Sequence, residues 1–65
     1  MAQFKIEASS AKAAKTVSGT NAKFPSPADF ADKAAADAQA AKYATDLNHD
    51  DHEGVWDWVG VATAV

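Results

Sequence analysis

The residues best suited to chemistry form the run His49-Asp50-Asp51-His52-Glu53. Imidazole and carboxylate groups are good ligands for zinc and nickel, and two histidines three residues apart can chelate one ion where the chain turns. A structural or catalytic site needs further ligands, and the sequence offers no third one at a fixed position. We therefore interpret the run first as an acidic loop, expect no cofactor, and keep His49 and His52 as candidate metal ligands.

The remaining polar residues do not form a catalytic pattern. The serines occupy cap and loop positions, and none is matched with a histidine and an orienting carboxylate. Asp50 and Asp51 are neighbours, and neighbouring carboxylates in a loop usually point apart, which does not suit an acid–base pair. A chain of 65 residues also leaves little room for an enclosed pocket. The sequence favours a protein that is not an enzyme.

Three aromatic residues can be interpreted either as core residues or as binding anchors. Trp56 and Trp58 lie two residues apart, so they would share one face of a strand. We expect at least one of them in the core, because an indole ring buries a large apolar area. Tryptophan is also enriched at the centres of protein interfaces. Trp56 and Tyr43 are therefore the candidate aromatic anchors.

Charge is divided unevenly along the chain. Four lysines and one glutamate precede Ala28, giving +3, whereas two lysines and eight carboxylates follow, giving −6. The absence of arginine argues against direct binding of nucleic acid, because arginine is the usual reader of phosphates and base edges. A partner protein with a basic, nucleic-acid-binding groove would suit an acidic face. That expected face consists of Asp29, Asp32, Asp37, Asp46, Asp50, Asp51, Glu53 and Asp57.

Length and composition limit the fold to a single small domain, residues 1–65. Such a chain buries only about 60% of the surface that its unfolded form exposes. It has no cysteine for a disulfide, which suits the cytoplasm. No apolar run approaches the ~20 residues that cross a membrane, and the N-terminus does not resemble a signal peptide. We expect a soluble cytoplasmic domain, stabilised in part by a partner or a second copy.

The first half of the chain predicts a strand and a short helix. Apolar and charged residues alternate over Phe4–Ala8, which predicts a strand with one buried face. Ser9-Ser10 can cap a helix, and the alanines and lysines that follow favour one. Glycine accepts the left-handed conformation that often follows the last turn of a helix. We therefore predict a short helix that starts after Ser9-Ser10 and ends at Gly19.

The sequence Ser26-Pro27-Ala28-Asp29 predicts the start of a long helix. Serine is a preferred N-cap, proline is favoured at the first helical position, and aspartate complements the helix dipole. Because neither glycine nor proline follows before Leu47, we predict a helix over Pro27–Leu47 and a polar loop over Asn48–Gly54. One of its apolar faces would contain Phe30, Ala34, Ala38, Ala41 and Thr45, and another Ala36, Ala40, Tyr43 and Leu47.

The end of the chain predicts a long strand. Val55–Val65 is rich in β-branched and aromatic residues, and Gly60 within it would mark a bulge or a point of close approach. The expected fold is α+β, with a small sheet, one long helix packed on it and one short helix. The expected core is one tryptophan with Phe4, Ile6, Val17, Phe24, Phe30, Ala34, Ala41, Leu47, Val59 and Val61.

The segment Phe4-Lys5-Ile6-Glu7-Ala8-Ser9-Ser10, followed by Ala14, resembles the strand and serine-capped helix that open many small phage and mobile-element proteins. In size, acidity and lack of cysteine, the chain is similar to small anti-CRISPR proteins. This resemblance implies an inhibitor in the host cytoplasm that blocks the DNA-binding surface of a CRISPR effector complex by imitating the charge of nucleic acid. Two alternatives stay open: a metal-binding module that uses His49 and His52, and a homo-oligomer joined by the C-terminal strand.

Overall fold

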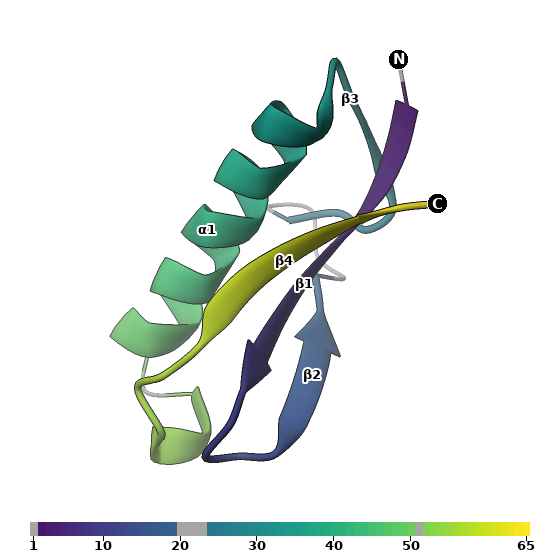
Figure 1. Cartoon of the computed structure of the whole chain (residues 1–65). Helices are drawn as coiled ribbons and strands as arrows, with labels where there is room; N and C mark the ends of the chain where they lie inside the picture. Colours follow the sequence, from purple (N-terminus) through teal and green to yellow (C-terminus); the bar gives the residue numbers. More distant parts are fainter. Residues whose placement is uncertain (1, 20–23, 51) are drawn as a thin grey trace.

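Strand β1 (Ala2–Ser10) forms the centre of the fold, and the other elements are arranged around it (Figure 1). The computed structural model describes residues 2–19, 24–50 and 52–65. After β1 come β2 (Lys15–Ser18), β3 (Ala28–Phe30), α1 (Lys33–His49), the 3₁₀ turn η1 (His52–Gly54) and β4 (Val59–Ala64). Within the described ranges the four strands form one antiparallel sheet with α1 across one face, which confirms the α+β class.

Both edges of β1 are paired. β4 runs along one edge, opposite residues 4–9 of β1. β2 and β3 lie end to end along the other edge, beside the second and first parts of β1. Between them the backbone N–H of Ile6 donates to the Ser26 hydroxyl at 2.9 Å, and the Ile6 carbonyl accepts from the N–H of Gly19 at 2.9 Å. The backbone of Ile6, at the middle of the sheet, is therefore hydrogen-bonded at both its N–H and its carbonyl.

The predicted short helix after Ser9-Ser10 is wrong, because this segment forms a β-hairpin. Residues 11–14 turn the chain, and β2 returns antiparallel to β1. The Ser10 hydroxyl accepts from the N–H of Ala13 at 3.0 Å, so its capping bond closes a turn. Ala14 has a φ of 55°, which is incompatible with a right-handed helix. A helix this short is marginal by itself, whereas β2 gains a ladder of bonds to β1.

The long helix begins later than predicted. Ser26 is not its N-cap, because the Ser26 hydroxyl is hydrogen-bonded to β1, and Pro27 is not its first residue. Ala28–Phe30 pairs with β1 as β3 instead, and Asp32 is the N-cap. The helix ends at His49, two residues beyond the predicted end. Among the described residues, no helix has both the length and the apolarity to cross a bilayer.

The last strand is shorter than the predicted Val55–Val65, since β4 covers Val59–Ala64. Trp56 has a φ of 62°, which interrupts the extended chain before β4. The pairing of β4 with β1 is continuous, so Gly60 is not at a bulge. It is a point of close approach, as the sequence also suggests: a Cβ added there would lie 2.2 Å from the carbonyl oxygen of Ala40 in α1.

The core fills the space between α1 and the sheet. It consists of Phe4, Ile6, Ala8, Phe24, Ala36, Ala40, Tyr43, Ala44, Trp58 and Ala62. This confirms three of the predicted core residues and the expectation of one buried tryptophan. Val17, Phe30 and Leu47 are half-buried and pack against this core.

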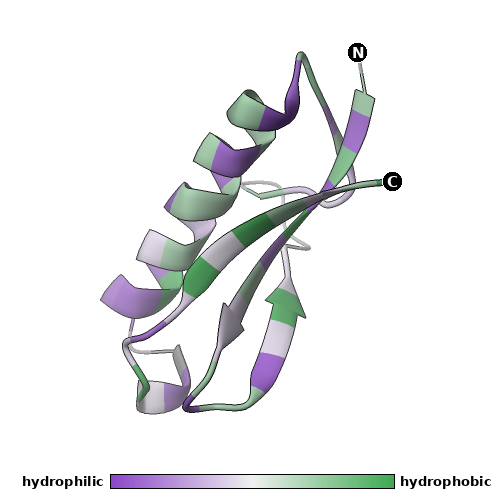
Figure 2. Cartoon of the chain, in the orientation of Figure 1, coloured by the Kyte–Doolittle hydropathy of each residue, from purple (hydrophilic) through white to green (hydrophobic). Residues whose placement is uncertain are grey.

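Four predicted core residues are exposed, which corrects the prediction: Ala34, Ala41, Val59 and Val61. α1 turns the second of its two apolar faces to the sheet. β4 places glycine and alanine beneath α1, where the backbones approach closely, and this puts its valines on the opposite face. Figure 2 shows strongly apolar positions separated by a near-neutral one in the first part of β4.

Candidate functional site

The structure divides the predicted acidic residues between the two ends of α1. Near its N-terminal end are Asp29 in β3, Asp32 at the N-cap and Asp37 in the helix. Near its C-terminal end are Asp46, Asp50, Glu53 in η1 and Asp57 beyond it. Asp51 lies outside the described residues. Because the 17 residues of α1 extend about 25 Å, the two groups would meet different parts of a partner.

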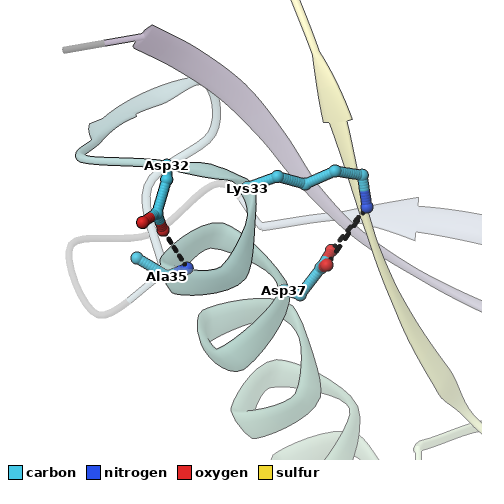
Figure 3. A network of polar contacts seen from close by, with 4 residues as sticks. All are labelled: Asp32, Lys33, Ala35 and Asp37. Atoms are coloured by element: carbon cyan, nitrogen blue, oxygen red, sulfur yellow. Dashed lines mark hydrogen bonds and ion pairs between the residues drawn. The ribbon is translucent and has the colours of Figure 1, made fainter.

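At the N-terminal end, two carboxylates are used in local contacts (Figure 3). Asp32 accepts a hydrogen bond from the N–H of Ala35 at 2.9 Å. Lys33 Nζ lies 3.0 and 3.1 Å from the two carboxylate oxygens of Asp37, one helical turn away. Asp29 is exposed and lies opposite Gln3 in β1. These contacts explain Asp32 and Asp37 as helix-stabilising residues without reference to a partner.

Replacing Asp32 by alanine is expected to lower the free energy of unfolding by about 1 kcal/mol, because the first turn of α1 loses its cap. Asp37→Ala removes only an exposed i, i+4 ion pair and should cost less than about 0.5 kcal/mol. Urea unfolding of both variants compares the two roles. Equal losses would show that the cap contributes no more than a surface charge.

At the C-terminal end, Asp57 joins the segment before β4 to the β1–β2 turn. The Ser10 hydroxyl donates to Asp57 Oδ1, and the N–H of Lys12 donates to Asp57 Oδ2 at 3.1 Å. These bonds stabilise the charged carboxylate and hold the pKa of Asp57 below its ordinary value. The hydrogen bond from Ser10 is the largest cause of this lowering. Ser10 itself is only 3% exposed. The alternation over Phe4–Ala8 places Ser10 on the buried face, so its burial could have been predicted from the sequence, whereas its contact with Asp57 could not.

Two further contacts hold the same segment. Lys15 Nζ lies 2.9 Å from Glu53 Oε2 and links η1 to β2. The Asn48 side chain accepts from the N–H of Trp58 at 2.9 Å and donates to the Trp58 carbonyl at 3.2 Å. Residues 53–58 are thus held at Glu53, Asp57 and Trp58, by contacts that the sequence did not predict.

Trp56 lies between these contacts and is presented to solvent. Trp56 is 58% exposed, whereas Trp58 is 4% exposed in the core. A φ of 62° is uncommon for a residue with a large side chain and costs about 1 kcal/mol or more. The fold therefore holds a large aromatic residue outward in a strained conformation. Such strain, where it is observed, points to a functional position.

Tyr43, the other candidate anchor, is a core residue. It is 8% exposed, and the centroids of its ring and the Phe24 ring are 5.3 Å apart. Its hydroxyl donates to the Ser18 carbonyl at 3.0 Å. Burial raises its pKa. Of the two candidate aromatic anchors, Trp56 is therefore the one that a partner can reach.

The structure describes the side chain of His49 but not that of His52, the other candidate metal ligand. His49 Nδ1 lies 3.3 Å from Asp50 Oδ1, and both side chains are largely exposed. The side chain of His52 and all of Asp51 lie outside what the structure describes. Among the described residues, no three histidine or carboxylate side chains gather as metal ligands would. Metal binding by His49 and His52 stays a prediction.

An open groove of about 320 Å³ lies beside α1, at the low end of the sizes that hold small ligands. It is lined by Phe24, Ala41, Lys42, Thr45 and Asp46. The Thr45 hydroxyl donates to the Ala41 carbonyl at 2.9 Å, so it is used within the helix. The groove offers a shallow apolar contact next to the C-terminal group of carboxylates.

No protein-family model matches the chain, and neither the curated proteins nor the solved structures provide a match.

Proposed function

We propose that this is a non-enzymatic binding protein that docks through its loop end, defined as Asp46, Asp50, Glu53 and Trp56. The exposure of Trp56 in a strained but well-held backbone carries this proposal. A rigid aromatic side chain loses little conformational entropy on binding, and buried tryptophans contribute strongly at interface centres. Holding the indole outward before a partner arrives lowers the cost of binding.

The charge of the loop end suggests a basic partner. Asp50 caps the C-terminus of α1 and is exposed, and the helix dipole adds negative potential there. Such a surface attracts cationic grooves and would speed association in a salt-dependent way. A groove that normally holds a phosphate backbone has the required charge. An inhibitor of a CRISPR effector complex, blocking its DNA-binding surface, is the form of this function that we propose.

The proposal is tested on purified CRISPR effector complexes of several types, by measuring their affinity for labelled target DNA with and without the protein. At least one complex should lose DNA affinity. Trp56→Ala should weaken this inhibition about tenfold, and Asp50→Lys should weaken it and reduce its salt dependence. The matched control Asp29→Lys, at the opposite end of α1, should inhibit like the wild type. Unchanged DNA binding for every complex would contradict the inhibitor function.

Trp56→Gly separates binding from folding. Glycine adopts a φ of 62° without strain, so this variant should be as stable as the wild type or more stable by up to about 1 kcal/mol. It should nevertheless inhibit as poorly as Trp56→Ala. A variant that is stabilised and still fully inhibitory would remove Trp56 from the binding surface.

A further inference from the structure

The face of the sheet opposite α1 carries a column of exposed valines. Val59, Val61 and Val65 are 62%, 43% and 70% exposed, and they alternate with the residues that face the helix. The next column, on β1, contains Lys5 and Glu7, which point to the same side because they alternate with the buried Phe4, Ile6 and Ala8. One long edge of this open face is apolar, and the strand beside it is charged.

The register of β1 and β4 fixes how these residues are arranged. Thr63 lies opposite Lys5, Val61 opposite Glu7, and Val59 opposite Ser9. The face therefore consists of rows, in which a β4 residue stands beside its β1 partner. The row with Lys5 and the row with Glu7 are adjacent. A line drawn midway between these rows therefore has a positive side chain on one side and a negative side chain at the same distance on the other.

This arrangement is self-complementary. Consider a two-fold axis in the plane of contact, perpendicular to the strands and between the Lys5 and Glu7 rows. Two copies packed face to face about it place Lys5 of each copy opposite Glu7 of the other. The same operation places Val61 opposite Thr63 and Val59 opposite Val65. Isologous interfaces of homodimers have this property.

We propose that the open face of the sheet joins two copies of this chain, through that two-fold arrangement. Charge complementarity and the pairing of Val59 with Val65 favour a second copy over an unrelated partner. The loop end lies outside the open face, so each copy keeps it available, and the dimer does not depend on the proposed inhibitor function.

Pairing through the outer edge of β4 is the alternative route to a dimer, and the structure favours it less. The Ile6 backbone points away from β4, so the backbone of its partner Ala62 points to the outer edge. Ala62 is only 4% exposed, which leaves the middle of that edge covered. At Trp58 the edge is occupied by the Asn48 side chain. A face-to-face contact needs neither position.

The size of the face predicts a weak dimer. Three strands about 4.8 Å apart and four rows about 6.8 Å apart give on the order of 300 Å² per copy in projection. Two such faces bury less than the ~1,200 to 2,000 Å² of stable complexes. We therefore expect a dissociation constant on the order of micromolar or weaker, and a monomer–dimer equilibrium that depends on protein concentration.

Sedimentation equilibrium from about 10 μM to 1 mM tests this proposal. The wild type should shift from monomer to dimer over this range. Val61→Lys should weaken the dimer at least about tenfold, whereas the control Ala38→Lys on the exposed side of α1 should leave it unchanged. Circular dichroism and thermal unfolding of each variant show whether it is folded.

Charge exchange tests the two-fold register itself. Lys5→Glu and Glu7→Lys should each be monomeric, because both facing positions then carry the same charge. The double variant Lys5→Glu/Glu7→Lys, and an equimolar mixture of the two single variants, should dimerise like the wild type. A wild type that stays monomeric to 1 mM overturns the proposal. So does a dimer that is unaffected by the single charge reversals, which edge pairing would give.

Discussion

Gly60→Ala is expected to lower the free energy of unfolding by about 3 kcal/mol, because the added methyl group has no room between β4 and α1. The new Cβ would lie 2.2 Å from the carbonyl oxygen and 2.3 Å from the carbonyl carbon of Ala40, and 2.7 Å from the amide nitrogen of Ala41. All three atoms belong to the backbone of α1, so no side chain can rotate away. The helix must move as a unit, which loosens its packing on β1 and β4.

The expected loss is large relative to the total free energy of unfolding. A domain of this length has a free energy of unfolding of roughly 3 to 10 kcal/mol, so the variant would have a strongly reduced melting temperature or be partly unfolded. Urea unfolding at a protein concentration well below the expected dissociation constant of the dimer measures the difference, because dimerisation would otherwise contribute. Thr63→Val, a change on the exposed face of the same strand, should stay within about 0.5 kcal/mol of the wild type.

A second substitution identifies the obstacle. If the Ala40 methyl group were in the way, Gly60→Ala/Ala40→Gly would recover stability. Because the contact is with the Ala40 carbonyl, we expect no recovery, and a further loss of about 1 kcal/mol from glycine in a helix. Recovery in the double variant, or a loss below about 1 kcal/mol for Gly60→Ala, would contradict the close contact.

The parts of the fold that could be predicted are those in which local sequence and tertiary packing agree. The alternation over Phe4–Ala8 predicts the buried face of β1, and Gly60 marks the close approach of the helix to the sheet. The expectation that one tryptophan is buried holds for Trp58. Each of these signals depends on a residue type whose size or conformation leaves few other interpretations.

The predictions from the sequence are wrong where a residue that suits one local structure makes a different contact in the fold. Ser10 and Ser26 are both suited to cap helices, yet Ser10 binds Asp57 and the turn, and Ser26 binds the β1 backbone. The alanines near residue 12 favour a helix, but pairing with an existing strand gains more than one helical turn can. Such outcomes depend on contacts between distant residues, which composition and spacing do not contain.

The candidate site shows the same limit. The sequence identifies Trp56 as an anchor but not the contacts that hold it, because Lys15, Asn48 and Ser10 reach it only through the fold. The sequence shows that the carboxylates are concentrated in the second half of the chain, but it does not show that α1 separates them into two groups. Nor does a strand of valines show which of its faces is covered, since both contain apolar residues.

Ser10→Ala is expected to lower the free energy of unfolding by about 2 kcal/mol at neutral pH, because a buried hydroxyl that both donates and accepts is lost. Ser10 is 3% exposed, donates to Asp57 and accepts from the N–H of Ala13 at 3.0 Å. Ser18→Ala is the matched control, since the Ser18 hydroxyl is exposed and contacts Glu7 at 3.4 Å. That variant should lose less than about 0.5 kcal/mol.

The effect of Ser10→Ala should depend on pH. The pKa of Asp57 is lowered in the folded state, chiefly by the Ser10 hydrogen bond, so the folded protein binds this proton less tightly than the unfolded chain. The associated stability is complete above the ordinary aspartate pKa and is lost as the pH falls through the lowered value. The difference between wild type and Ser10→Ala should therefore shrink in acid, which urea unfolding over a pH series measures.

Asp57→Asn assigns this dependence to one carboxylate. The amide keeps an oxygen that can accept from Ser10 but has no charge to titrate, so Ser10→Ala should cost less in this background, and the cost should no longer change with pH. A cost of Ser10→Ala that is equal in both backgrounds would locate its effect in the β1–β2 turn, through Ala13, and not in the link to Asp57. Since that link holds the segment on one side of Trp56, Ser10→Ala should also increase amide hydrogen exchange at residues 55–58, whereas Ser18→Ala should not.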